Sequence, residues 1–303
     1  MPDNKKIFAT PKVRKFAREL GANISEIEGS ERLGRITEDD VKNFVNKNLN
    51  KSQIKKNNKI NLDFEHSEFG DVEIIEIPRI KRLAAPHLSN SWNTIPHVTH
   101  HDEADITELE DFRANLTDSI SGDKIKITPL AFIVKALANN LKKFPSFNSS
   151  IDNIIEGKIT LKKYYHIGIA VDTKHGLMVP KIRNVEQKKI REIAEDLKKV
   201  SDLSKTLKIN KKEFFGGSIT VTSLGGIGGK FFTPIINYPE VAILGVGRSY
   251  KKQIFIKDKF LARTVLPISL SYDHRIIDGA EAAKFCNSLK SNLGENFAYN
   301  LAF

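Results

Sequence analysis

Residues 271–280 read SYDHRIIDGA, and this stretch decides how the larger part of the chain folds. An apolar run at about 264–272 predicts a strand before it, and the apolar spacing at about 279–292 predicts an amphipathic helix after it. The turn between these elements carries an ionisable cluster: Asp273, His274, Arg275 and Asp278. The position of this cluster, between a strand and a helix, suggests a function.

The cluster has two interpretations. In the first, Asp278 only caps the helix by accepting its free backbone N–H groups, and His274 is an ordinary loop residue. In the second, a buried Asp–Arg pair holds the turn rigid while His274 keeps one ring nitrogen free as a general base. Two aspartates and an arginine lie close to the histidine in sequence, which favours the catalytic interpretation.

The chain of 303 residues, 40% of them hydrophobic, is long enough for one large domain and one small domain. We expect an N-terminal tail at 1–7, a small all-α domain at 8–46, a flexible linker at 47–71 and a large domain at 72–303. The linker begins with a Lys/Asn-rich stretch at 47–62 that has no acidic residue and no apolar periodicity.

The small domain has two predicted helices joined by a glycine-containing loop. Thr10 and Pro11 begin the first helix, as an N-cap hydroxyl and a proline at the first helical position, and Gly21 ends it. Thr37 begins the second helix, with Asp40 in the place of the usual glutamate of a capping box. Four basic residues are not needed for the core and form either a solvated face or a docking surface: Arg14, Lys15, Arg18 and Arg35.

The net charge of +11 is concentrated at the front of the chain, where residues 1–60 contain 14 Lys/Arg against 8 Asp/Glu. We therefore expect a partner with an acidic surface. Nucleic acid is the rival partner. It lacks support, because the basic run at 47–59 has no interleaved aromatic residue and the chain has no zinc, RRM or KH signature.

Three observations bear on the location of the protein. No apolar run approaches the ~18 residues that are needed to span a bilayer, so we expect no membrane partner. The start, MPDNKKIFATP, has the pattern of neither a signal peptide nor a transit peptide. Cys286 is the single cysteine, and we interpret it as a buried core residue rather than a catalytic thiol. We expect a cytoplasmic protein.

Helices and strands are mixed without regular alternation in the large domain, which predicts an α+β or α/β sandwich. A helical pattern runs from Ile80 to Trp92, where Pro86 should kink or interrupt it. A buried helix begins at Thr128 and ends before Pro145. The other predicted elements are strands near 97–105, 159–172, 177–183, 218–223 and 241–247, and a charged amphipathic helix at about 188–206.

Several common chemistries have little support. The chain has no G-x-S-x-G elbow for a serine acyl-enzyme and no Walker motif. HVTHHD at 97–102 suggests a metal site, but His97 and His101 would lie roughly 13 Å apart on one face of a strand, and His100 would point to the other face. We expect no metal site.

A second informative stretch is SITVTSLGGIGGKFFTPIIN at 218–237. Its strand ends in hydroxyls at Thr222 and Ser223, and glycines such as Gly225 and Gly226 follow, which let a backbone approach a ligand closely. One interpretation is a hairpin turn after ordinary strand residues. The other is a hydroxyl that donates a hydrogen bond to a developing oxyanion.

Together these stretches resemble the catalytic domain of the dihydrolipoyl acyltransferases of 2-oxo acid dehydrogenase complexes. The family's D-H-R-x-x-D-G motif is matched from Asp273 to Gly279, and GSITVTSLGGIGG and FTPIINYPEVAILGVG resemble its upstream segments. IPHVTHHDEADITELEDFR, KITPLAFIVKAL and LKKYYHIGIAVDTKHGLMVP are more similar to the acetyltransferases of pyruvate dehydrogenase complexes than to succinyl or branched-chain relatives. Residues 8–46 resemble the peripheral-subunit-binding domain of the family, and no lipoyl domain is recognisable.

The resemblance implies a chloramphenicol-acetyltransferase-like two-layer α/β sandwich, assembled as trimers with active sites between subunits, and a cubic or icosahedral core of trimers. It implies that His274 takes the proton from the thiol of CoA or dihydrolipoamide, and that Thr222 of a neighbouring subunit binds the oxyanion. Asp278 would orient the structure around the histidine, and no acyl-enzyme would form. The implied substrate-binding residues are Ser223, Gly225, Gly226, Asn237 and Arg79.

The resemblance also implies partners. The lipoyl group would come from another domain or chain, with no cofactor bound covalently here. The decarboxylase and dihydrolipoyl dehydrogenase components would dock on residues 8–46 through Arg14, Lys15, Arg18 and Arg35. Three alternatives remain: a non-catalytic tethering scaffold of the same fold, an acyltransferase for succinyl or branched-chain groups, and a free-standing acetyltransferase for a small acceptor.

Overall fold

The computed structural model describes residues 8–20, 22–31, 34–45, 64–117, 122–153 and 156–298. The chain divides into two compact units, Met1–Ile75 and Glu76–Phe303. The predicted tail at 1–7 and the Lys/Asn-rich stretch at 47–62 lie outside the described residues.

The small unit contains the two helices that the sequence predicts. α1 spans Pro11–Glu19, and the Thr10 hydroxyl accepts a hydrogen bond from the Val13 N–H at 3.3 Å. The 3-10 helix η1 (Ile24–Glu26) follows, and residues 38–45 form the second α-helix. Their buried apolar side chains form a small separate core: Val13, Ala17, Ile27, Ile36 and Val41.

The second helix begins with the predicted capping box. Thr37 Oγ1 accepts a hydrogen bond from the Asp40 N–H at 3.2 Å, and the Asp40 carboxylate accepts from the N–H groups of Thr37 and Ser30 at 2.9 and 3.1 Å. Burial favours the protonated carboxyl group, but these hydrogen bonds outweigh it and hold the pKa of Asp40 at about 2. The predicted helix end at Gly21 lies outside the described residues. A further 3-10 helix, η2 (His66–Phe69), belongs to the same unit.

The large unit is built on a mixed sheet. Within the described residues this sheet has seven strands, in the order β1-β9-β7-β6-β4-β5, with β8 paired to β9. β4, β6 and β7 run parallel, and the other pairs are antiparallel. The strands span His97–Asp105 (β1), Ile167–Ile169 (β4), Lys181–Ile182 (β5), Ile219–Ser223 (β6), Ala242–Val246 (β7), Tyr250–Ile256 (β8) and Lys259–Asp273 (β9). β2 (Ser149–Asn153) and β3 (Lys158–Leu161) form a separate two-stranded sheet.

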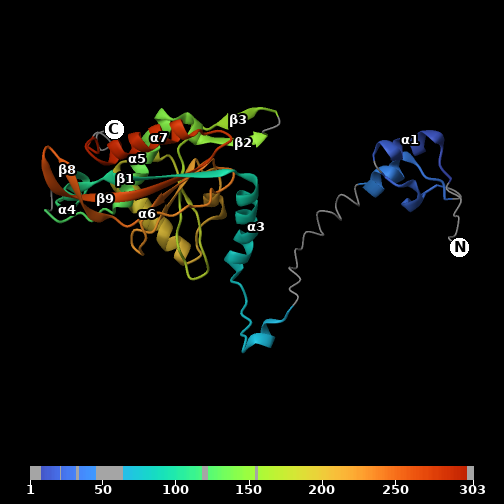
Figure 1. Ribbon diagram of the computed structural model, residues 1–303, viewed down its shortest axis with the longest axis horizontal. Helices are drawn as coiled ribbons and strands as arrows, with labels where there is room; N and C mark the ends of the chain where they lie inside the picture. Colours follow the sequence, from blue (N-terminus) through green and yellow to red (C-terminus); the bar gives the residue numbers. More distant parts are fainter. Residues whose placement is uncertain are drawn as a thin grey trace. The chain divides into compact units, whose positions relative to one another are not determined.

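Three long helices pack with this sheet around one core. They are α5 (Pro129–Lys143), α6 (Ile190–Lys205) and α7 (Gly279–Leu293). Figure 1 shows α5 and α7 close together along the sheet, and the Asn140 amide of α5 donates a hydrogen bond to the Phe285 carbonyl of α7 at 3.0 Å. The remaining helices of this unit are α3 (Arg79–Thr94), α4 (Thr107–Ala114), η3 (Pro145–Asn148), η4 (Val185–Gln187) and η5 (Lys211–Phe214).

The alternation of side chains along the strands gives the sheet two different faces. Val221, Leu244 and Leu270 belong to the core that the helices cover. Their strand neighbours point to the opposite face and are mostly polar: Thr220, Thr222, Ser269, Ser271 and Asp273. One covered face and one polar face make the predicted two-layer α/β sandwich.

The prediction of one strand at 159–172 is wrong, because this range contains two strands, β3 and β4. β3 and β4 belong to different sheets, because the chain turns between them at Lys162. The Lys162 ammonium donates hydrogen bonds to the carbonyls of Ser149 at 3.1 Å and of Gly217 at 2.8 Å. This anchor is made by residues far from the turn in sequence, so the local pattern does not reveal it.

Pro86 does not end the helix in which it lies, since α3 is continuous from Arg79 to Thr94, and the predicted kink at Pro86 stays a prediction. Pro86 is exposed, so water can bind the carbonyl group that loses its helical partner. The sequence reasoning missed α4, β2, β8 and the 3-10 helices altogether. β9 begins earlier than the predicted strand and β5 is shorter than predicted, whereas the other α-helices and strands lie close to their predicted ranges.

Candidate active site

The turn between β9 and α7 is held on both sides of His274. Asp273, 1% exposed, accepts hydrogen bonds from the Arg275 guanidinium at 2.9 and 2.6 Å and from the Arg275 N–H at 3.0 Å. The bonds to Asp273 raise the pKa of the Arg275 guanidinium. Asp278 caps α7 by accepting from the Glu281 N–H at 2.7 Å. The structure therefore contains the predicted Asp–Arg pair and the predicted helix cap.

His274 itself lies in the exposed middle of this turn. Its N–H donates to the Pro96 carbonyl at 3.1 Å, which ties the turn to the start of β1. Its ring centroid lies 5.9 Å from that of Tyr272. Within the described part of the chain, the ring nitrogens of His274 have no hydrogen-bond partner. An accessible imidazole on a fixed backbone is suited to accept a proton.

Thr222 lies on the polar face near the end of β6, far from His274 of the same chain. Thr222 is opposite Gly245 of β7, which is opposite Ser269 of β9, and His274 follows Ser269 by five residues. Five residues at about 3.3 Å each put His274 about 16 Å from Thr222 along the strands. Two strand spacings of about 4.8 Å put it about 10 Å away across the strands. One reacting group cannot contact both residues within a single chain.

Ser223 and the glycines after it form a turn. Ser223 is exposed, and its hydroxyl accepts a hydrogen bond from the Gly225 N–H at 3.4 Å. The Leu224 carbonyl accepts from the N–H groups of Ile227 and Gly228 at 2.9 and 2.8 Å. The segment is therefore a turn, but it is not the hairpin of the first interpretation, because β6 and β7 run parallel.

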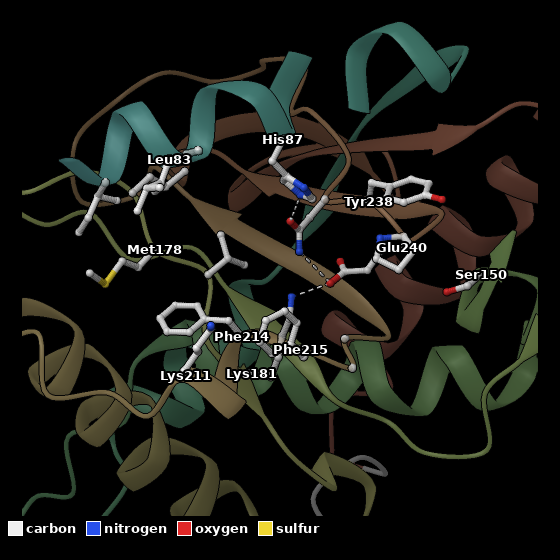
Figure 2. Close-up of a pocket in the computed structure, with 18 of the residues that line it drawn as sticks. Leu83, His87, Ser150, Met178, Lys181, Lys211, Phe214, Phe215, Tyr238 and Glu240 are labelled. Carbon is white, nitrogen blue, oxygen red and sulfur yellow. Dashed lines mark hydrogen bonds and ion pairs between the residues drawn. The ribbon is translucent and has the colours of Figure 1, made fainter. Parts of the chain in front are cut away.

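A pocket of about 740 Å³ opens between α3 and the loops that precede β6 and β7. Figure 2 shows Leu83 and His87 of α3 on one side of it, and Met178, Phe214 and Phe215 on the other. These mostly apolar walls suit an aliphatic chain.

The pocket belongs to the His274 end of the sheet. The Asp273 N–H bonds to the Val241 carbonyl at 2.8 Å, which brings the pocket residue Glu240 level with His274. Of the predicted substrate-binding residues, Asn237 lines this pocket. The others do not: Arg79, which is the exposed first residue of α3, Ser223, Gly225 and Gly226.

A chain of polar side chains lies at the inner end of the pocket (Figure 2). The Lys181 ammonium is 2.6 Å from Glu240 Oε1, and these side chains are 1% and 2% exposed. Glu240 also accepts hydrogen bonds from the Thr220 hydroxyl at 2.6 Å and the Asn237 amide at 3.1 Å. The Asn237 amide oxygen in turn lies 3.1 Å from His87 Nε2.

Sequence reasoning missed this buried pair. The available signal was a charged residue at a core position in each of two apolar segments, MVPKI at 178–182 and YPEVAILGV at 238–246. Charged residues of this kind are rarely buried unless they are paired.

Two of the three histidines of β1, His97 and His101, are bonded within the fold. His97 Nδ1 lies 2.8 Å from the Ile95 carbonyl, and its Nε2 accepts from the Ile236 N–H at 3.0 Å. His101 Nδ1 lies 2.9 Å from the Ser269 hydroxyl. Among the described residues, no three metal-ligating side chains gather into a site.

The basic residues singled out in the small unit are all exposed: Arg14, Lys15, Arg18 and Arg35. Arg14 and Arg18 lie along α1, where their Nε atoms donate to the carbonyls of Ala9 and Arg14 at 3.2 and 3.3 Å. In the described part of the chain, no helix has the length and apolar character needed to cross a membrane.

Two family models match the chain. Residues 69–299 match the 2-oxoacid dehydrogenases acyltransferase (catalytic domain), and residues 7–42 match the e3 binding domain. The chain is 44% identical over 295 residues to the dihydrolipoyllysine-residue acetyltransferase component of the pyruvate dehydrogenase complex of Cupriavidus necator, covering 93% of this chain and 53% of that protein. It is 38% identical to the corresponding component of Bacillus subtilis, covering 96% and 67%. The chain spans about half the length of the first of these relatives.

Two solved structures support the same family assignment. The dihydrolipoamide acetyltransferase of Azotobacter vinelandii superposes with a TM-score of 0.75 and 40% identity, covering 78% of this chain and 97% of that one. A structure described as the cubic core of the pyruvate dehydrogenase multienzyme complex gives the same values. The catalytic-domain match covers most of the chain and coincides with the sandwich that carries the His274 turn. The chain therefore belongs to the family of 2-oxoacid dehydrogenase acyltransferases.

Proposed function

We propose that the large unit transfers an acetyl group between the thiols of dihydrolipoamide and CoA. The observation that carries this proposal is the accessible imidazole of His274, on a turn fixed by Asp273 and Asp278, beside an apolar pocket. Both substrates present a thiol at the end of a long flexible arm. A thiol of ordinary pKa, ~8.5, is mostly protonated at neutral pH and needs a base to attack.

The transfer needs no acyl-enzyme. His274 accepts the proton of the attacking thiol, and the resulting thiolate adds to the carbonyl carbon of the acyl thioester on the other substrate. The tetrahedral intermediate collapses by breaking its bond to the original sulfur. The imidazolium returns the proton to that leaving thiolate, which restores the neutral histidine. Asp278 keeps the turn in place as the cap of α7.

The oxyanion of the intermediate needs a hydrogen-bond donor, and we assign this role to the Thr222 hydroxyl of a second subunit. The separation of Thr222 from His274 within one chain supports a site between subunits. A second support comes from the Azotobacter acetyltransferase, whose study concerns the catalytic role of a serine, a histidine and an asparagine. Those residues have the same spacing in sequence as Thr222, His274 and Asp278.

We further propose a homotrimer as the unit of assembly, and a cubic or icosahedral core of trimers. The likeness to the cubic core structure supports this. The small unit would bind dihydrolipoyl dehydrogenase or the decarboxylase component, as its match to the e3 binding domain suggests. Lipoyl groups would be delivered by a lipoyl domain elsewhere in the complex.

The test is an assay of the chain with acetyl-CoA and free dihydrolipoamide. We expect transfer by the wild-type chain, and loss of at least about 10²-fold in His274→Ala, because a positioned general base contributes about that much. Size-exclusion chromatography should give the same oligomer for both proteins. Activity of His274→Ala within tenfold of the wild type would exclude this mechanism, and an inactive wild type would favour a tethering scaffold.

A further inference from the structure

The buried pair of Lys181 and Glu240 is the most unusual feature that the proposed reaction leaves unused. Its side chains are 1% and 2% exposed, and it joins β5 to the loop before β7. Two glycines make room for it. A Cβ atom at Gly168 would overlap Lys181 Nζ, and one at Gly217 would overlap Glu240 Oε1. The fold therefore reserves space for these two charges.

Such a pair does little for stability. The desolvation of two buried charges offsets most of their attraction, and apolar residues of similar volume are often as stable or more stable. The presence of Lys181 and Glu240 in the core therefore points to a role other than holding the fold together.

The hydrogen bonds of Glu240 show what the pair positions. Its carboxylate only accepts, so the Asn237 amide must present its NH₂ group to Glu240, at 3.1 Å. The amide oxygen of Asn237 then faces His87, whose Nε2 must carry a proton to donate to it at 3.1 Å. The orientation of His87 is thus fixed through Asn237 by the carboxylate of Glu240, which lies in the loop before β7 and pairs with Lys181 of β5.

This link matters because α3 has few other anchors in the described chain. Ser91 is its buried residue, whereas Leu83 and Trp92 are 68% and 57% exposed. His87 and Leu83 both line the pocket. The side of the pocket that α3 provides is therefore tied to the loop before β7 by the hydrogen bond from His87 to Asn237. Glu240 also binds Thr220, two residues before Thr222 on the same face of β6.

We propose that Lys181, Glu240 and Asn237 are positioning residues that hold His87 and the pocket-lining part of α3 in place for the substrate arm. The proposal rests on the proposed acetyl transfer, in which that arm is an aliphatic chain that ends in a thiol or thioester. Loss of the pair widens the pocket and weakens substrate binding while the fold persists.

The experiment uses the full chain with the double substitution Lys181→Met and Glu240→Met. We expect a thermal unfolding midpoint close to that of the wild type, because the apolar pair removes both charges together. We expect KM for free dihydrolipoamide or for acetyl-CoA to rise about tenfold, as the loss of one well-placed hydrogen bond would do, with a smaller change in kcat. Hydrogen exchange of the peptide 79–94 should become faster.

Three further variants separate positioning from general damage. His87→Ala should reproduce the rise in KM, and His87→Asn, which keeps a donor, should restore much of the affinity. The control removes a lysine–carboxylate pair away from the pocket, by Lys188→Met with Asp196→Met. This control should leave KM and the exchange of α3 unchanged.

An unchanged KM and unchanged exchange in the Lys181/Glu240 double variant would overturn the proposal. If that double variant does not fold, the KM of His87→Ala tests the proposal instead. An unchanged KM in His87→Ala would also overturn it. A wild-type chain without transfer activity would refute the proposed function instead. The exchange of α3 would still report whether the pair positions the helix.

Discussion

Thr222 and Ser223 are adjacent hydroxyls in different surroundings. Thr222 lies on the polar face of β6, whereas the Ser223 hydroxyl accepts a bond from the Gly225 N–H in the turn that follows. We expect Thr222→Ala to lower kcat by about 10²–10³ with little change in KM, because an oxyanion donor acts mainly in the transition state. Thr222→Ser should retain most of the activity.

Ser223→Ala is the matched control for this prediction and should remain within a few-fold of the wild type. Steady-state kinetics of the three variants with acetyl-CoA and dihydrolipoamide would settle the matter. A larger loss in Ser223→Ala than in Thr222→Ala would show that the wrong hydroxyl has been assigned.

Cys286 is the single cysteine, and the structure places it in the core. Burial raises the pKa of its thiol to about 12, so the reactive thiolate is scarce at neutral pH. We expect native protein at pH 8 to resist alkylation by iodoacetamide, whereas protein in denaturant takes up one label per chain. Mass spectrometry of the intact chain measures this. Stoichiometric labelling of the native protein would contradict the assignment of Cys286 to the core.

At the scale of elements, the connection between the residue before β4 and the turn after β5 depends on a neutral histidine. His166 Nδ1 accepts a hydrogen bond from the Asn184 N–H at 3.1 Å, and Asn184 has a left-handed backbone, with φ of 52°. The ring of His166 packs against the ring of Tyr164, with their centroids 4.5 Å apart. Burial lowers the pKa of His166, and nearby Arg183 acts in the same direction.

This lowered pKa predicts the direction of a pH effect. The unfolded chain protonates His166 near its ordinary pKa of ~6.5, and the folded chain only at lower pH. The contribution of the neutral ring to stability is therefore complete above about pH 6.5 and is lost as the pH falls through the folded-state pKa. His166→Asn keeps an acceptor without a titrating group, so its unfolding midpoint should fall less between pH 7.5 and 5.5 than that of the wild type.

His175 supplies the control for this measurement, since it is exposed in a turn. His175→Asn should show the same loss of midpoint at pH 5.5 as the wild type. Equal pH dependence of His166→Asn and the wild type would mean that His166 does not set the acid stability of this region.

The elements that could be predicted from the sequence are those with local signals. Thr10, Thr37 and Asp278 cap their helices as predicted, because an N-cap and its partner lie three residues apart. β8 and the Lys181–Glu240 pair were missed because they depend on partners distant in sequence: β8 on β9, and each charge on the other. The Asp273–Arg275 pair and the Asp278 cap on either side of His274 were predicted because both lie within one turn.

At the scale of the molecule, the small unit presents its basic residues outward. Arginine suits the recognition of an acidic partner, because its planar group pairs with a carboxylate in two ways. We expect the substitutions Arg14→Glu and Arg35→Glu in the full chain to slow association with dihydrolipoyl dehydrogenase about tenfold or more, with a smaller effect on dissociation. Raised salt should slow the wild type similarly.

Surface plasmon resonance at two salt concentrations would measure these rates, with the decarboxylase component and duplex DNA as further analytes. Lys259→Glu, an exposed charge reversal on the β8–β9 hairpin of the other unit, is the control and should leave association unchanged. Salt-independent binding would contradict a docking surface that acts through charge, and tighter binding to DNA than to either enzyme would indicate a nucleic-acid surface instead.

The separation of Thr222 from His274 makes a prediction about the assembly as a whole. If each active site combines His274 of one subunit with Thr222 of another, two inactive variants complement each other when their subunits mix. His274→Ala and Thr222→Ala, refolded together in equal amounts, should then recover about a quarter of the wild-type activity. In a random mixture each site has about one chance in two of an intact histidine and about one in two of an intact threonine, so about a quarter of the sites have both.

The controls are each variant refolded alone, and a chain that carries both substitutions mixed with either single variant. All of them should stay inactive. Recovery that depends on co-refolding places the two groups on different subunits, and no recovery despite intact mixed oligomers would place the whole reaction within one chain, against the distance that the strand register imposes.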